Sequence, residues 1–165
     1  MNKKTIVTLA DSNYFSLLGE LIHSIRKFKE SESVNICVLD AGLTSEQIEK
    51  ISSSVDDIKK AEWDIQIPFH KKKKEWLKSQ ISRAFLPKYF PNYEKYLWID
   101  CDAWVNSWSC IENYFKACEN NKLGITQSIG PGYRSLAKVN WIFGKIAAIK
   151  TQNYKHAKMS GVSEN

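Results

Sequence analysis

Short apolar segments alternate along this chain with segments whose apolar residues have helical spacing. Residues 4–10, 34–39 and 96–99 each have the length of a strand, and the last of them is apolar on both faces, which is typical of a strand buried inside a sheet. Between the first two, apolar side chains repeat along residues 14–29 at helical spacing. This order predicts an α/β fold, with a mostly parallel sheet flanked by helices.

Further elements are expected beyond this pattern. Thr44 and Gln47 have the spacing of a capping box, which predicts a helix over residues 45–53. The other expected elements are a short strand at Ile65–Ile67, helices over 75–85 and 111–119, a strand over 123–126, and a strand or helix over 139–149. We expect residues 1–150 to form a single domain and residues 151–165 to form a polar, frayed tail.

Two aspartates follow the third apolar run, in the sequence Asp100-Cys101-Asp102. Because side chains alternate along a strand, we expect Asp100 and Asp102 to point the same way and Cys101 the other. Two neighbouring carboxylates stay ionised together when a positive charge lies between them, and Mg²⁺ or Mn²⁺ is a natural occupant. The alternative is a solvated turn or a helix cap, which many Asp-x-Asp sequences form.

Right-handed crossovers would bring the carboxyl ends of the strands to one edge of the sheet. Residues 10–13, 40–42 and 100–102 would then converge there. The chain has neither the Gly-x-Gly-x-x-Gly sequence of dinucleotide-binding folds nor a Gly-x-x-x-x-Gly-Lys-Ser/Thr phosphate loop. A nucleotide would have to be held by a metal ion, by scattered polar groups and by the strand ends.

The net charge of +6 comes mostly from one run, Lys71–Lys74. Such a local run argues against a dedicated nucleic-acid-binding protein, whose basic residues usually spread along a face. The run is either a solvated loop or a weak contact with an anionic acceptor or an acidic membrane surface. We find no signal peptide and no apolar run long enough to cross a bilayer, and the four cysteines lack zinc-site spacing, so a cytoplasmic location is expected.

Two segments resemble glycosyltransferase family 8, which has the GT-A fold. Residues 5–25 are similar to the opening strand and helix of that family. Residues 81–102 are similar to its block of an Arg-bearing helix, a Leu-Pro step and a strand ending in Asp-x-Asp. The resemblance implies a Rossmann-like GT-A domain and a retaining transfer of sugar from a nucleotide sugar, usually a UDP-sugar, with Mn²⁺ or Mg²⁺.

The resemblance also implies roles for individual residues. Asp100 and Asp102 match the metal-binding carboxylates, and Arg83 matches an arginine that reaches the donor, so Arg83 and Asp100 are the implied catalytic residues. The loop that holds the uridine corresponds to Ala10, Asp11, Asn13 and Tyr14. From the residues alone, Asp11 is equally an N-cap, Tyr14 a core or rim aromatic, and Arg83 a solvated helix charge.

The chain departs from the family toward its C-terminus. Family members usually continue further and supply a histidine to the metal, whereas His156 lacks the family's His-x-x-Gly context. We therefore expect a C-terminally incomplete donor-binding part. Two other readings stay open: a non-catalytic relative that binds nucleotide or a partner, and a different Mg²⁺-dependent phosphotransfer domain. The sugar and the acceptor, whether saccharide, lipid-linked or protein, are not identified by these residues.

Overall fold

The computed structural model describes residues 4–67, 77–119 and 123–124. The chain divides into two compact units, Met1–Lys116 and Ala117–Asn165. The elements below lie in the first unit, apart from the last residue of the final helix. The expected element over 139–149, the domain boundary at 150 and the tail over 151–165 lie outside the described residues.

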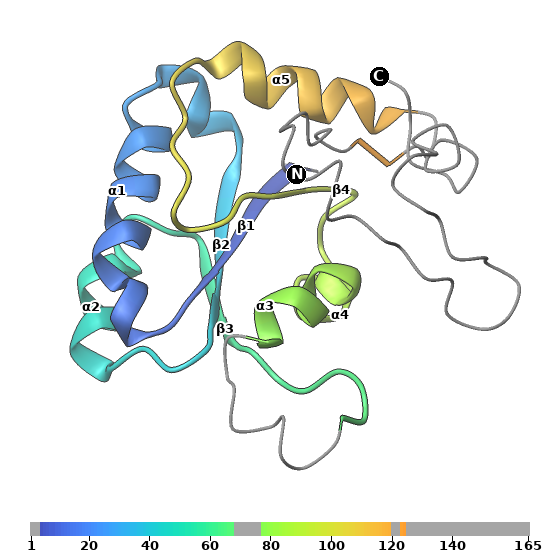
Figure 1. Ribbon diagram of the computed structural model, residues 1–165. Coiled ribbons are helices and arrows are strands. Elements are labelled where there is room, and N and C mark those ends of the chain that lie inside the picture. Colours follow the sequence, from blue (N-terminus) through green and yellow to red (C-terminus); the bar gives the residue numbers. More distant parts are fainter. Residues whose placement is uncertain (1–3, 68–76, 120–122, 125–165) are drawn as a thin grey trace, which may run out of the picture. The chain divides into compact units, whose positions relative to one another are not determined.

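A four-stranded parallel sheet forms the centre of the first unit (Figure 1). Its order is β3-β2-β1-β4, with β1 in a central position. The strands span Lys4–Ala10 (β1), Asn35–Asp40 (β2), Asp57–Lys60 (β3) and Lys95–Trp98 (β4). The register pairs Ala10 with Asp40 and Val7 with Trp98, so β1 and β2 end level with each other. This arrangement confirms the predicted α/β class.

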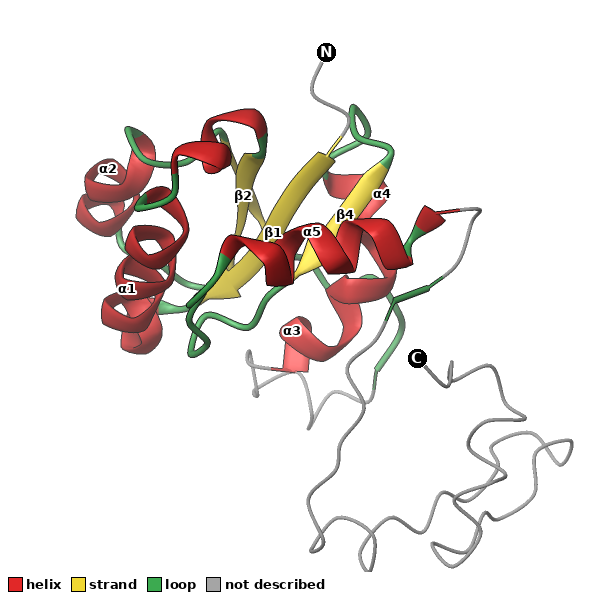
Figure 2. Ribbon diagram, turned by 90° about the horizontal axis from the view of Figure 1, so that it is seen from above, coloured by secondary structure: helices red, strands yellow, loops and turns green. Residues whose placement is uncertain are grey.

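Helices cover both faces of the sheet (Figure 2). One face carries α1 (Phe15–Arg26), α2 (Ser45–Ser52) and α5 (Trp108–Ala117). The other face packs against η4 (Arg83–Phe85) and α4 (Leu86–Tyr89), which follow α3 (Leu77–Ser82). Two short 3₁₀ turns, η1 (Ser12–Tyr14) and η2 (Lys29–Ser33), flank α1.

The core follows the alternation of side chains along β1. Ile6 and Ala10 face the α1 side, where the helix contributes an apolar stripe of Leu18, Leu21, Ile22 and Ile25. Val7 and Leu9 face the other side and pack with Leu86 and Phe90. Burying both faces is what makes β1 a continuous apolar run. Within the part of the chain that the structure describes, every helix is too short or too polar to span a bilayer.

One predicted strand is wrong, and one observed strand was not predicted. Ile65–Ile67 is not a strand, and the sheet instead gains β3, Asp57–Lys60, which the sequence did not indicate. This edge strand is half-buried and carries two lysines, as edge strands often do, so it shows no apolar run. The segment after it is held by the buried carboxylate of Asp64, which accepts hydrogen bonds from Tyr89 and Lys88.

The predicted aspartate-bearing strand ends earlier than expected. β4 stops at Trp98, and residues 100–103 form a turn in which the Ala103 amide donates to the carbonyl of Asp100 at 3.0 Å. The strand alternation invoked for Asp100 and Asp102 therefore does not apply to them. By contrast, the predicted capping box is confirmed, since Thr44 and Gln47 exchange both of its hydrogen bonds.

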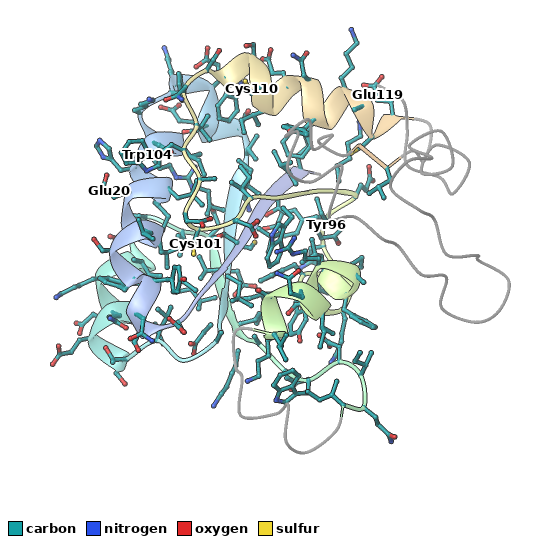
Figure 3. The ribbon with its side chains drawn as sticks, in the orientation of Figure 1. Glu20, Tyr96, Cys101, Trp104, Cys110 and Glu119 are labelled. Carbon is teal, nitrogen blue, oxygen red and sulfur yellow. The ribbon has the colours of Figure 1, made fainter. Side chains whose placement is uncertain are left out.

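Alkaline pH is expected to destabilise the fold through the tyrosines on the α4 side. The Tyr93 hydroxyl accepts a hydrogen bond from the Asn35 amide at 2.8 Å, and the Tyr96 hydroxyl, labelled in Figure 3, donates to the Phe90 carbonyl at 2.7 Å. Burial raises the pKa of Tyr93 from 10.0 to about 12 and also raises the pKa of Tyr96.

The sign of the effect follows from proton linkage. A phenol with a raised pKa binds more protons in the folded state, so its contribution is complete below pH 10 and is lost as the pH rises toward about 12. Calorimetric Tm should fall across that window, and it should fall less steeply in Tyr93→Phe. An equal slope in the two proteins would contradict this assignment.

Candidate functional site

A cavity of about 270 Å³ lies at the carboxyl ends of the central strands. We call it the strand-end cavity. Six of the seven predicted site residues line it: Ala10, Asp11, Tyr14, Arg83, Asp100 and Asp102. Asn13 is not among its lining residues, although Asp11 and Tyr14 are. Parallel α/β sheets characteristically bind ligands at this edge, outside the carboxyl ends of their strands.

The loops after β1 and β2 are fastened to each other. The Ala41 amide donates to the Ala10 carbonyl at 3.0 Å, and the Ser12 amide donates to the Gly42 carbonyl at 3.1 Å. Asp40 closes its own turn by accepting from the amides of Gly42 and Leu43. Gly42 has a φ of 133°, which favours glycine, and a side chain there would approach the Cβ of Asp11 to 3.9 Å. The floor of the cavity is therefore fixed by backbone hydrogen bonds.

Asp11 caps the first turn after β1. Its Oδ1 accepts hydrogen bonds from the amides of Asn13 at 2.9 Å and Tyr14 at 3.2 Å. The predicted capping role is confirmed, and the same residue also lines the cavity. The Tyr14 ring is 47% exposed, so it belongs to the rim rather than the core. An exposed aromatic at a cavity mouth presents a flat apolar face to a ligand.

Arg83 and Asp100 form an ion pair across the cavity. The Arg83 Nη2 donates to Asp100 Oδ1 at 2.9 Å, and its Nε donates to the Ser79 carbonyl at 2.9 Å. The two side chains are 36% and 53% exposed, so the pair is worth at most about 1 kcal/mol. Such a pair orients both groups in the free protein and is weak enough to rearrange around a ligand.

Asp102 contrasts with Asp100. It is exposed and has no hydrogen-bond or ion-pair partner within residues 4–67 and 77–119. Two carboxylates at one cavity suit a hard divalent cation, which keeps further positions for water and phosphate. In the described residues, no three His, Cys, Asp or Glu side chains gather as a metal site. The donor set at this cavity therefore fits a divalent cation to which the protein offers two carboxylates.

Cys101 lies between the two aspartates on the segment that joins β4 to α5 (Figure 3). Burial raises the pKa of its thiol to about 11, and the charge of Asp102 adds to the increase. The thiol is therefore neutral near pH 7 and is not a nucleophile. Cys101 instead packs in the core on the α1 side, as a small apolar side chain.

A larger, shallow hollow of about 560 Å³ lies at the end of α1, around Arg26 and Asp56. The Arg26 guanidinium donates hydrogen bonds there to three backbone carbonyls and to the Asp56 carboxylate, the last at 2.9 Å. Asp56 in turn accepts from the Ile36 amide. These contacts tie α1 to β2, so we regard this hollow as structural and the strand-end cavity as the functional site.

The predicted site residues did not include Leu9, Ala41, Ser79 and Gln80, which line the cavity, or Trp98, which contacts two of its side chains. The Trp98 Nε1 donates to Asp100 Oδ1 at 2.8 Å, while its side chain packs against the core. Its ring also lies 5.1 Å from the Arg83 guanidinium. The two-residue spacing between Trp98 and Asp100 was the available signal. Lys71–Lys74 and His156 lie outside the described residues.

Comparison with known proteins agrees with this arrangement. The sequence profile of glycosyl transferase family 8 matches residues 5–157, which is most of the chain and includes both the first strand and the aspartate pair. A search of curated proteins gave no match. With the parallel α/β sheet and the strand-end cavity, the match shows that the chain belongs to glycosyltransferase family 8.

Proposed function

We propose that the strand-end cavity binds a nucleotide-sugar donor, most simply a UDP-sugar, together with Mn²⁺ or Mg²⁺, and that the protein transfers the sugar to an acceptor. The observation that carries the proposal is the meeting of Asp100, Asp102 and Arg83 in one cavity of a family 8 chain. Family membership supplies the reaction class, glycosyl transfer. The cavity's charges supply the argument for the donor.

The nucleoside end of the donor is assigned to the loop after β1. Ala10 and Asp11 line the cavity, and Tyr14 offers an exposed ring beside them. Asp11 uses one carboxylate oxygen for capping, so its other oxygen is the one left for a ribose hydroxyl or a base N–H. Asn13, which does not line the cavity, is proposed as a rim contact.

The diphosphate end is assigned to Asp100, Asp102 and Arg83. Asp100 and Asp102 would hold the cation, which supplies charge neutralisation to the departing diphosphate. Arg83 keeps its charge at any physiological pH and offers several donors to phosphate or sugar oxygens. Its hydrogen bond to the Ser79 carbonyl fixes the guanidinium at the cavity wall, so it is oriented before the donor arrives.

Two features stay predictions from the sequence: the cytoplasmic location and a weak membrane contact through Lys71–Lys74. The acceptor is not identified. Loops define acceptor sites, and they vary even where the fold is kept.

The direct test is a nucleotide panel. We expect UDP with Mn²⁺ to raise the Tm, by an amount that grows with UDP concentration as mass action requires. UDP without metal should give a smaller shift. Incubation with UDP-glucose, UDP-galactose and UDP-N-acetylglucosamine should then release UDP slowly in the presence of Mn²⁺, by transfer to water or to an added saccharide.

The outcomes separate the alternatives. A shift with ATP and none with UDP would favour a phosphotransfer domain. A shift with UDP but no release of UDP from any donor would favour a non-catalytic binding module. Absence of a shift with every nucleotide would overturn the proposal that this cavity binds a donor.

A further inference from the structure

Trp98 is the last residue of β4 and contacts two of the charged side chains of the strand-end cavity, Asp100 and Arg83. Its indole Nε1 donates to Asp100 Oδ1 at 2.8 Å. The Arg83 guanidinium lies 5.1 Å from the centre of its ring, within the range of a cation–π interaction. Trp98 therefore joins the arginine to the aspartate, while its side chain also packs against the core.

Both donors meet on one oxygen. Trp98 and Arg83 each donate to Asp100 Oδ1, at 2.8 and 2.9 Å. Asp100 Oδ2 has no hydrogen-bond or ion-pair partner within the described ranges. Two hydrogen bonds to one oxygen fix the rotation of the carboxylate, so the other oxygen has a set direction.

The strand explains why Trp98 reaches this position. Its backbone is paired with Val7 in the sheet, which anchors the side chain at the last point where β4 is regular. Asp100 follows in the turn, and the Ile99 amide donates to the Val7 carbonyl at 3.0 Å, which continues the attachment to β1. A carboxylate in a turn has more rotational freedom than one in a strand. A hydrogen-bond partner on the rigid strand therefore restricts the rotation of the Asp100 carboxylate.

We propose that Trp98 is a positioning residue of the donor site. It fixes the Asp100 carboxylate through Oδ1, which leaves Oδ2 as the oxygen that would ligate a cation, and it keeps the Arg83 guanidinium over its ring at the cavity. The inference rests on the proposed donor-binding function and deepens it. The role acts through Asp100 and Arg83, since nothing requires Trp98 itself to touch the reacting atoms.

Trp98→Phe isolates the hydrogen bond, because phenylalanine keeps an aromatic face under Arg83 but lacks the N–H. Calorimetric titration of UDP in saturating Mn²⁺ should give an affinity about tenfold weaker than wild type, the usual effect of removing a partner of a metal ligand. The Tm of the ligand-free variant should change little, since the lost bond is solvent-accessible. Trp104→Phe is the matched control, because Trp104 is 63% exposed on the segment after β4. The affinity of this variant for UDP should equal that of wild type.

A nuclear magnetic resonance measurement tests the contact itself. The indole N–H signal of Trp98, identified by its absence from Trp98→Phe or from Trp98→Leu if the first variant does not fold, should move in Asp100→Asn. It should also move when UDP and Mg²⁺ are added to wild type, with diamagnetic Mg²⁺ replacing Mn²⁺ to avoid broadening. A merely structural tryptophan would not respond to either change.

The outcomes distinguish this inference from the function on which it rests. If wild type does not bind UDP with metal, the donor-binding function fails. If wild type binds and Trp98→Phe binds equally well, or if the indole signal is indifferent to both Asp100→Asn and UDP with Mg²⁺, the positioning role is overturned while the function stands.

Discussion

Replacing Asp102 with asparagine is expected to abolish most of the stabilisation that UDP and Mn²⁺ give. The substitution keeps the shape of the side chain and removes its charge, so it weakens the hold on a divalent cation. We expect an affinity at least about 100-fold weaker. At a ligand concentration 100 times the wild-type Kd, stabilisation would fall from about 2.7 kcal/mol to about 0.4 kcal/mol. Differential scanning calorimetry with and without ligand measures both values.

The ligand-free Asp102→Asn protein should be as stable as wild type. Asp102 is exposed and makes no hydrogen bond or ion pair with the residues around it that the structure describes, so the fold does not depend on it. Asp57→Asn is the matched control: Asp57 is a partly exposed carboxylate at the amino end of β3, paired 3.5 Å from Lys59. It should leave the ligand-induced shift intact. An undiminished shift in Asp102→Asn would place the cation elsewhere.

The fold class could be predicted because the buried strands of a parallel sheet are recognisable in the sequence as nearly continuous apolar runs. Residues 4–10 and 34–39 are almost continuously apolar, and residues 5–10 are buried on both faces of the sheet. β3 could not be found in this way. An edge strand pairs through its backbone on one side only, and its side chains Lys59 and Lys60 stay in solvent. Nothing in its composition distinguishes it from a loop.

The position of the candidate site was predicted from the convergence of the strand ends, although the argument from side-chain alternation was wrong. Strand ends meet at one edge whatever their side chains do, so Asp11 and Asp100 lie at one cavity as expected. The alternation argument assumed that the strand continues through Asp102, whereas the strand ends at Trp98 and a turn spans residues 100–103. The hydrogen bond from Arg83 to Asp100 depends on the tertiary approach of η4, which no local pattern encodes.

Replacing Arg83 with lysine is expected to lower the rate of sugar transfer by a factor of roughly 10² to 10³, the range found when one transition-state donor is removed. Arg83 makes three contacts at once: Nε to the Ser79 carbonyl, Nη2 to Asp100, and its face to the Trp98 ring. A lysine ammonium is a single charged group on a flexible stem, so it keeps the charge but cannot reproduce the three together. Steady-state release of UDP from the best donor measures the change.

The distribution of the loss between kcat and KM tells what Arg83 does. An arginine that stabilises the charge developing on the diphosphate should lower kcat and leave KM nearly unchanged, whereas one that only binds the ground-state donor should raise KM alone. Arg26→Lys is the matched control, because Arg26 is equally well hydrogen-bonded but ties α1 to β2. That variant should lose Tm and keep its kcat at a temperature where it is folded. If Arg83→Lys instead behaves like Arg26→Lys, with a lower Tm and an unchanged kcat, then the ion pair with Asp100 serves the fold rather than the transfer.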